Sequence, residues 1–185
     1  MLWTAYRHAA AQRGSVGVRF PRGAGTGLPL DEPLAEIPIG VSETLREGRD
    51  VVLVAYGHPV NAALAAAEVL AQDGVSATVV NARFAKPLDA ERLLELAARI
   101  PRFATIEEHV IAGGFGSAVA ELFQERATPV ELEMLGIPDE HVDHGAQSLW
   151  RHHYGLDAEG IARSVRVRWP ELGAPAGARA KETAG

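Results

Sequence analysis

The sequence predicts an α/β fold in which helices cover both faces of a mainly parallel, five-stranded sheet. Apolar, β-prone runs alternate with helical segments along most of the 185 residues. Such alternation is typical of parallel strands joined by right-handed crossovers. The run Val51–Ala55 is apolar throughout, as expected for a strand that is covered on both faces. The expected architecture is therefore a three-layer sandwich with the sheet in the middle.

Each element has a local reason in the sequence. The expected strands are short and rich in branched or aromatic residues, and they are residues 41–45, 51–55, 75–81, 103–106 and 129–134. The expected helices repeat apolar side chains at helical spacing, and they are residues 60–72, 90–100, 117–126, 146–153 and 158–167. Gly74 suits the end of the first of these helices, and Asp89 suits the N-cap of the second.

The first expected strand differs in direction from the second. Only Arg46–Asp50 lies between them, whereas a parallel crossover needs about a dozen residues. The strand at residues 41–45 is therefore expected to run antiparallel to the strand at residues 51–55.

The N-terminal part of the chain has the features of the end of a preceding unit. Leu2–Gln12 predicts a short helix and Val16–Phe20 a short strand, and the stretch after them is rich in Gly and Pro, which is typical of a linker. A helix and one strand cannot bury a core by themselves. We therefore expect a tail of a preceding domain, a linker, a main domain and a disordered tail, at residues 1–23, 24–38, 39–169 and 170–185.

Composition excludes several classes of function. The chain carries a net charge of −6 and has no basic stripe, so we expect no nucleic-acid partner. It contains no cysteine, which excludes disulfides, thiol catalysis and zinc–thiolate sites and fits a cytoplasmic protein. It has no apolar run of about 18 residues, so no membrane span and no membrane partner are expected.

The glycine-rich turn after the strand at residues 103–106 is the main candidate site. Gly113, Gly114 and Gly116 allow the sharp reversal that joins this strand to the following helix. The free N–H groups of that helix start face the C-terminal edge of the sheet, where open α/β folds meet ligands or partner surfaces. The alternative is a structural turn with no ligand. The spacing matches neither a dinucleotide fingerprint nor a phosphate-binding loop, so no nucleotide site is expected.

Two acidic residues precede this turn. Glu107 and Glu108 are neighbours on a strand and therefore point to opposite faces, so we expect no paired acid–base chemistry. We expect instead that one of them accepts backbone N–H groups of the turn or pairs across an interface.

The remaining polar motifs give one further candidate. The histidines lack the spacing of metal ligands on one helix face, so no metal site is expected; they include His141, His144, His152 and His153. Arg19 and Arg22 flank Phe20-Pro21, and arginine forks bind phosphate oxygens at two points. The alternative for both arginines is solvated charge on a linker.

Several longer motifs occur in one order, at Val18–Gly23, Pro38–Gly40, Asn81–Asp89, Thr105–Glu108, Gly113–Val119, Leu135–Asp139 and Gly155–Ile161. In this order and spacing they resemble the C-terminal part of the 1-deoxy-D-xylulose-5-phosphate synthase family, over about residues 2–166. The segments Arg83–Asp89 and Gly136–Asp139 distinguish the chain from pyruvate dehydrogenase β subunits and from ordinary transketolases.

The resemblance implies a transketolase C-terminal-domain-like fold within a larger enzyme. Such synthases condense pyruvate with glyceraldehyde 3-phosphate for isoprenoid (terpenoid) and thiamine biosynthesis, and they use thiamine diphosphate and Mg²⁺. In that family the cofactors lie on a Gly-Asp-Gly motif of the N-terminal domain, which this chain lacks. The activating glutamate lies in the pyrimidine-binding middle domain, whose last helix and strand match residues 1–23. The resemblance therefore implies no catalytic residue, no metal and no cofactor bound by this chain alone.

One substrate residue of the family carries over. Arg22 matches the second arginine of the family's Arg-Tyr-Pro-Arg-Gly segment, although Phe20 replaces the tyrosine, and it is expected to help hold the phosphate of the aldehyde substrate. Glu107 and the three glycines are expected to serve the structure of the turn and an interface.

Two hypotheses follow from this reasoning. The chain is a C-terminal fragment or subunit of such a transferase, inactive alone, that supports a homodimer with the missing N-terminal and middle domains or a separate subunit carrying them. Alternatively, it is a stand-alone, non-catalytic binding or regulatory module that keeps the fold.

Overall fold

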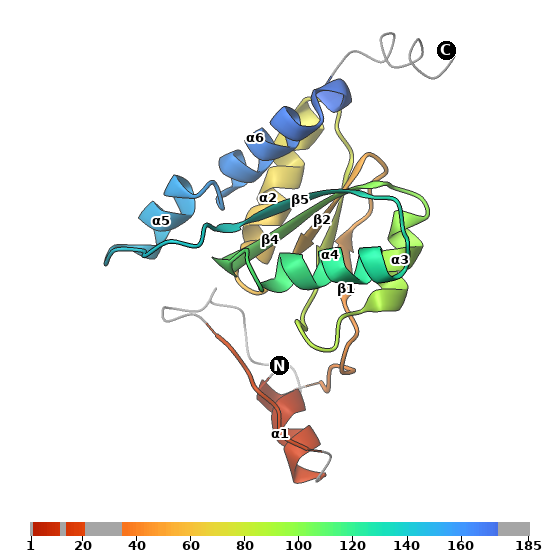
Figure 1. The fold of residues 1–185 in the computed structure, drawn as a ribbon, viewed down its shortest axis with the longest axis vertical. Coiled ribbons are helices and arrows are strands. Elements are labelled where there is room, and N and C mark those ends of the chain that lie inside the picture. Colours follow the sequence, from red (N-terminus) through yellow and green to blue (C-terminus); the bar gives the residue numbers. More distant parts are fainter. Residues whose placement is uncertain (1, 12–13, 21–34, 174–185) are drawn as a thin grey trace.

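A five-stranded sheet in the order β1-β3-β2-β4-β5 lies at the centre of the structure, with helices on both faces (Figure 1). This computed structural model describes residues 2–11, 14–20 and 35–173. The strands are β1 (Glu43–Arg46), β2 (Val51–Ala55), β3 (Ala77–Asn81), β4 (Arg102–Val110) and β5 (Glu131–Ile137). The predicted α/β sandwich is confirmed.

Four of the described helices form the two layers that cover the sheet. The described helices are α1 (Leu2–Ala10), α2 (Pro59–Gln72), α3 (Ala90–Ala97), α4 (Phe115–Glu125), α5 (Gln147–His153), α6 (Ala158–Arg168) and the 3₁₀ turn η1 (Pro170–Gly173). Helices α2 and α6 bury their apolar faces against Val51, Leu53 and Val79 of the sheet. Helices α3 and α4 pack on the opposite face, against Val52 and Val54. Because side chains of β2 pack into the core on each face of the sheet, all of its residues are buried, as its apolar run predicts.

The direction of β1 is as expected. β2 pairs in parallel with β3 and β4, and β4 pairs in parallel with β5. β1 runs antiparallel to these strands, and its hydrogen-bonded neighbour is β3 rather than β2. The short turn at Arg46–Asp50 therefore reverses the chain without pairing the two strands that it joins.

Asp89 fixes the start of α3, as its position before the helix predicts. One carboxylate oxygen accepts the backbone N–H of Arg92 at 3.1 Å, and the other accepts the N–H and the hydroxyl of Ser42, each at 2.7 Å. Burial raises the pKa of Asp89, but the hydrogen bonds from Ser42 and Arg92 outweigh it and lower the pKa below its ordinary value of 3.8. This side chain also ties the segment before β1 to α3.

The C-terminal end of the described chain is part of the core. Trp169 and Leu172 are buried against α2 and α6, and Pro170–Gly173 forms η1. The expectation of disorder from residue 170 is therefore wrong for residues 170–173, because Leu172 gains the apolar contacts that hold the turn. Residues 174–185 lie outside the described residues.

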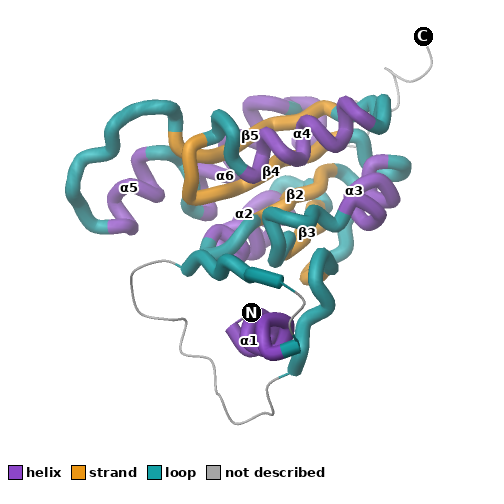
Figure 2. Tube along the Cα trace, turned by 60° about the horizontal axis from the view of Figure 1, so that its bottom comes forward, coloured by secondary structure: helices purple, strands orange, loops and turns teal. Residues whose placement is uncertain are grey.

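The N-terminal arm, defined here as residues 2–11 and 14–20, lies beside the main body (Figure 2). Helix α1 forms as predicted, but residues 14–20 are extended without strand pairing, so the predicted strand at Val16–Phe20 is wrong for this chain. The physical reason is that a strand needs a neighbour for its backbone N–H and C=O groups, and the described residues offer none here. Over the described ranges, no helix has the length and apolarity to cross a membrane.

Candidate functional site

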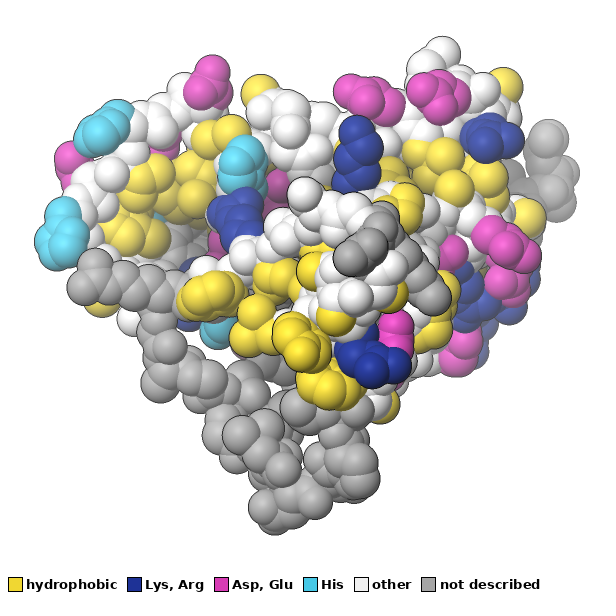
Figure 3. Space-filling view, turned by 90° about the horizontal axis from the view of Figure 1, so that it is seen from below, with side chains coloured by type: hydrophobic (Ala, Val, Ile, Leu, Met, Phe, Trp, Pro, Cys, Tyr) yellow, Lys and Arg dark blue, Asp and Glu magenta, His cyan; other side chains and the backbone are white. Residues whose placement is uncertain are grey.

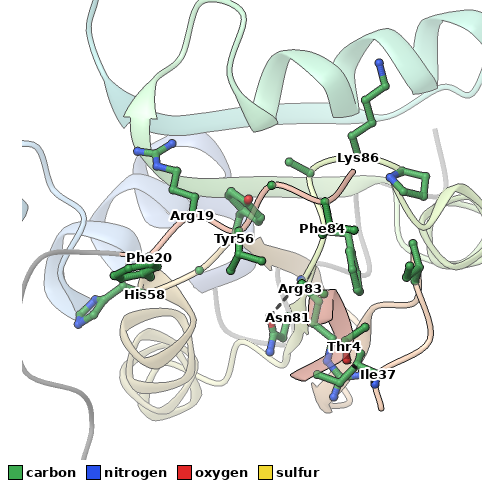
Figure 4. Close-up of a pocket in the computed structure, with 18 of the residues that line it drawn as sticks. Thr4, Arg19, Phe20, Ile37, Tyr56, His58, Asn81, Arg83, Phe84 and Lys86 are labelled. Atoms are coloured by element: carbon green, nitrogen blue, oxygen red, sulfur yellow. Dashed lines mark hydrogen bonds between the residues drawn. The ribbon is translucent and has the colours of Figure 1, made fainter. Parts of the chain in front are cut away.

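The carboxyl ends of β2, β3 and β4 meet at a cleft of about 1060 Å³ (Figure 4). β2 and β4 are neighbours in the sheet. The connection that leaves β2 leads to β3 on one side, whereas the connection that leaves β4 leads to β5 on the other side. In open α/β sheets this switch point is where ligands bind. Tyr56 and His58 follow β2, whereas Glu108 and His109 end β4, and all four line the cleft. The N-terminal arm forms the opposite wall.

Glu107 holds the glycine turn at this edge of the sheet. Its side chain is only 2% exposed. One carboxylate oxygen accepts the backbone N–H of Phe115 at 2.7 Å, and the other accepts that of Gly116 at 2.8 Å. These N–H groups belong to the first turn of α4, where a helix lacks internal partners and carries partial positive charge. The carboxylate therefore occupies the position at which an anionic ligand of α4 would otherwise bind.

Two glycines let the carboxylate approach so closely. A Cβ on Gly114 would overlap the carbonyl oxygen of Val110, and a Cβ on Gly116 would lie 2.6 Å from Thr105 Oγ1. Gly113 takes a φ of +70° at the start of the turn. The expected residues of the turn are thus brought together around Glu107, and each contact is internal to the fold.

Glu108 points away from Glu107 and joins three separate elements. Its carboxylate accepts a hydrogen bond from Arg151 Nε of α5, and its backbone oxygen accepts one from Arg19 Nη2 at 3.1 Å. His58 Nδ1, at the start of α2, lies 3.6 Å from the same carboxylate and has no hydrogen-bond partner among the described residues. The arm, the β2–α2 turn and α5 are therefore connected through this one residue of β4.

The acidic groups that line the cleft are neutralised by arginines. Glu43 pairs with Arg83 at 2.6 Å, and Glu108 pairs with Arg151. Arg83 has a φ of +58°, and its backbone N–H is held by Asn81 Oδ1 at 3.2 Å. Among the described residues, both carboxylates of the cleft wall are therefore paired with an arginine, and neither is free to act as a general base.

The described residues do not form a recognisable catalytic centre. No three histidine or acidic residues of ranges 2–11, 14–20 and 35–173 come together to hold a metal ion, including the histidines singled out above. His109 Nδ1 contacts the backbone oxygen of Val110 at 2.9 Å, and His58 faces a carboxylate that already pairs with an arginine. These contacts do not hold a nucleophile beside a base, as covalent catalysis requires. The arrangement can hold the backbone of the turn between β4 and α4 in place, and it can offer a surface to a binding partner.

The predicted phosphate-binding residue, Arg22, lies outside the described residues, whereas Arg19 lies on the cleft wall. The sequence pattern does not identify Tyr56, His58 or Arg151 as site residues. The segment Tyr56–Pro59 follows a fully apolar strand, and its place beside the switch point was the signal that could have identified it. Arg151 gives no comparable signal, because 43 residues separate it from its partner Glu108.

Comparisons with known proteins agree on one family. A sequence profile described as "Transketolase, C-terminal domain" matches residues 40–161. The 1-deoxy-D-xylulose-5-phosphate synthase of Heliobacterium modesticaldum is 48% identical over 160 residues, which are 86% of this chain and 25% of that protein. The corresponding synthase 1 of Geobacter sulfurreducens is 49% identical over 177 residues, which are 95% of this chain and 27% of that protein. The chain thus spans about a quarter of the length of these curated relatives.

A solved structure shares the fold. "Split gene transketolase, inactive beta4 tetramer" superposes with a TM-score of 0.68 at 33% identity, and the match covers 77% of this chain and 46% of that chain.

Proposed function

Because the chain belongs to the transketolase C-terminal domain family, we propose that it acts as the C-terminal part of a 1-deoxy-D-xylulose-5-phosphate synthase. The complete enzyme would condense pyruvate with glyceraldehyde 3-phosphate at the start of isoprenoid precursor synthesis. The observation that carries this proposal is the 48–49% identity to two such synthases over most of this chain. The chain would serve as a fragment or separate subunit that is inactive alone.

Thiamine diphosphate and Mg²⁺ would be held by the upstream domains. Mg²⁺ is bound by carboxylates together with phosphate oxygens and water, and the described residues contain no group of three acidic or histidine side chains for it. The described residues therefore do not fit the metal–diphosphate group, and the part that we propose for this chain is structural. It would support a cytoplasmic homodimer, with the Glu107 turn as a rigid part of the scaffold.

Arg22 is the one substrate-binding residue that we propose for this chain. A guanidinium fork suits the phosphate of glyceraldehyde 3-phosphate. It follows Arg19, whose guanidinium is fixed on the backbone of Glu108, so the segment that leads to Arg22 starts from an anchored point.

The second candidate function is a stand-alone binding or regulatory module. The observation that favours it is the cleft of about 1060 Å³ at the switch point between β2 and β4, which is the usual ligand-binding position of such sheets. A module of this kind would bind its ligand without any upstream polypeptide.

Mixing experiments distinguish the two functions. The upstream three-quarters of the H. modesticaldum synthase is produced as a separate polypeptide, and synthase activity is measured for each component alone and for the mixture, with both substrates, thiamine diphosphate and Mg²⁺ present. We expect product only from the mixture. Turnover by the 185-residue chain alone would refute the proposal, and a mixture without activity would favour the stand-alone module.

A further inference from the structure

Arg19 joins the N-terminal arm to the sheet of the main body. Its guanidinium Nη2 donates to the backbone oxygen of Glu108, in β4, at 3.1 Å (Figure 4). Thr4 Oγ1 instead accepts the N–H of Ile37 at 2.8 Å, and Ile37 precedes the sheet. No described residue of the arm belongs to either hydrophobic core cluster. The hydrogen bond from Arg19 to Glu108 therefore fixes where the end of the arm lies relative to the sheet.

Glu108 can reach the arm because it lies in a bulge of β4. Ile106 pairs with Leu135 of β5, and Val110 pairs with a residue only two further along β5, so four steps along β4 oppose two along β5. Gly136 of β5 permits this, because a Cβ there would lie 3.0 Å from a backbone oxygen of β4. Bulges re-aim the chain beside functional sites. Glu108 accordingly lines the cleft and can bind groups outside the sheet.

Arg151 of α5 fixes the side chain of Glu108. Its Nε donates to the Glu108 carboxylate, and its Nη2 donates to Gln147 Oε1 at 3.0 Å, so the guanidinium is held at two points. The Glu108 and Arg151 side chains are half-buried, at 26% and 21% exposure, and a half-buried charge is costly unless it is paired. Arg151 therefore allows Glu108 to stay at the edge of the cleft, where the arm meets it.

Polar groups are also visible on the outside of this junction. Figure 3 shows the molecule from below, from the end that carries the arm, and this face has basic and histidine side chains as well as hydrophobic ones. Arg19 is itself exposed, so its hydrogen bond to Glu108 competes with water. The contact therefore orients the arm without contributing much to the stability of the fold.

The orientation of Arg19 matters for the residue that follows it in the sequence. Three peptide steps lead from Arg19 to Arg22, the residue proposed above to bind phosphate, and three steps of chain span at most about 11 Å. An anchor at Arg19 therefore limits how far from the sheet a phosphate held by Arg22 can lie. A two-point contact between guanidinium and phosphate depends on such placement.

We propose that Arg19, Glu108 and Arg151 are positioning residues for the phosphate of the aldehyde substrate. Arg151 fixes Glu108 in the bulge of β4, Glu108 holds Arg19, and Arg19 anchors the segment that continues to Arg22. The three residues act through Arg22 rather than by touching the substrate. This inference rests on the proposed function, and it gives the C-terminal domain a part in the affinity for the phosphorylated substrate.

The test uses the mixture of the 185-residue chain with the upstream part of the H. modesticaldum synthase, with the chain in saturating excess so that weaker association does not alter the kinetics. The variants are Arg19→Met, Arg151→Met and the double variant. The matched control is Arg163→Met on α6, because Arg163 is exposed and takes no part in the pair with Glu108. We expect each single variant to raise the KM for glyceraldehyde 3-phosphate about threefold to tenfold, the effect of one hydrogen bond. The kcat and the KM for pyruvate should stay within about twofold, as when only binding is lost.

Three further readouts separate positioning from a general structural role. D-Glyceraldehyde is the same aldehyde without the phosphate, and its kcat/KM should be equal in the wild type and the variants. Arg19→Lys keeps a cationic donor and should recover part of the loss in Arg19→Met. The double variant should raise the KM for glyceraldehyde 3-phosphate by less than the product of the two single effects, because both arginines act through Glu108.

The outcomes distinguish this inference from the proposed function. If the wild-type mixture forms product but Arg19→Met keeps the wild-type KM for glyceraldehyde 3-phosphate, the positioning role is wrong and the proposed function stands. An equal loss with D-glyceraldehyde would also overturn the positioning role, since that substrate has no phosphate. Single effects that multiply in the double variant would overturn the part assigned to Arg151. A wild-type mixture without product would overturn the proposed function and this inference with it.

Discussion

Replacing Glu107 by alanine tests whether this buried carboxylate holds the turn between β4 and α4. The substitution removes the acceptor of two hydrogen bonds, from Phe115 at 2.7 Å and from Gly116 at 2.8 Å. Both donors are backbone N–H groups in a buried environment. Neither gains another acceptor when the side chain is shortened, and the space left by the carboxylate lies beneath the helix start.

The expected cost is large for one side chain. A hydrogen bond to a charged group contributes about 1.5–3 kcal/mol, and a buried donor left without an acceptor costs a similar amount. We therefore expect Glu107→Ala to lower the free energy of unfolding by about 3–5 kcal/mol. Glu107→Gln keeps one acceptor oxygen but turns an amide N–H₂ toward the second donor, so we expect about 2 kcal/mol. Since small domains are stable by about 5–15 kcal/mol, the alanine variant should be marginally folded.

The assay is urea unfolding of the 185-residue chain followed by circular dichroism. Glu121→Ala is the matched control, because Glu121 is an exposed glutamate of the same helix α4, and it should change the unfolding free energy by less than about 0.5 kcal/mol. A loss below about 1 kcal/mol in Glu107→Ala would refute the argument, since two charge-assisted hydrogen bonds cannot cost so little when their donors stay buried.

Three further predictions concern single contacts. Gly116→Ala should cost about 1–3 kcal/mol of unfolding free energy, because the new Cβ would lie 2.6 Å from Thr105 Oγ1, and Thr105→Ala should recover part of this loss in a double-mutant cycle. Asp89→Asn should cost about 1 kcal/mol at pH 7. The pKa of Asp89 is lowered by folding, so this difference should persist above the ordinary pKa of 3.8 and disappear as pH falls below about 4 in urea titrations. Arg151→Met should cost about 1 kcal/mol by removing the pair with Glu108 and should speed chymotrypsin cleavage within α5.

Each of these predictions has an outcome that contradicts it. Equal costs of Gly116→Ala with and without Thr105→Ala would show that the two side chains do not compete for space. If the loss of unfolding free energy in Asp89→Asn grew as the pH fell, it would contradict a lowered pKa of Asp89. An unchanged cleavage rate in Arg151→Met would show that α5 is held by other contacts, and Arg163→Met on α6, which takes no part in that ion pair, is the control.

The main body could be predicted from the sequence because its local signals agree with its packing. The apolar run of β2, the N-cap at Asp89 and the glycines before α4 each specify an element without reference to distant residues. β4 is longer than expected, because Val110 still pairs with Ile137 of β5. The polar residues Glu107–His109 interrupt the apolar pattern that marks a buried strand, so their pairing could not be predicted from periodicity.

The candidate site was predictable only in part. The turn glycines and the two glutamates stand out in the sequence, and strand alternation predicts their opposite directions. The partners of Glu108 could not be predicted, because Arg19 and Arg151 are 89 and 43 residues away along the chain and meet it only through the sheet topology.

The predicted strand at residues 16–20, which does not form, also shows which part of the chain contributes to the free energy of unfolding. Residues 16–20 have the composition of a strand, yet the structure leaves them unpaired, because they join neither of the two edge strands of the sheet, β1 and β5. The buried hydrophobic residues of the described chain begin only at Val51, so apolar burial stabilises the main body and not the arm. Changes at Glu107 should therefore lower the free energy of unfolding. Changes at the exposed residues Trp3 and Tyr6 should leave it unchanged, and a loss of unfolding free energy in a Trp3 or Tyr6 variant would show that the arm and the main body are energetically coupled.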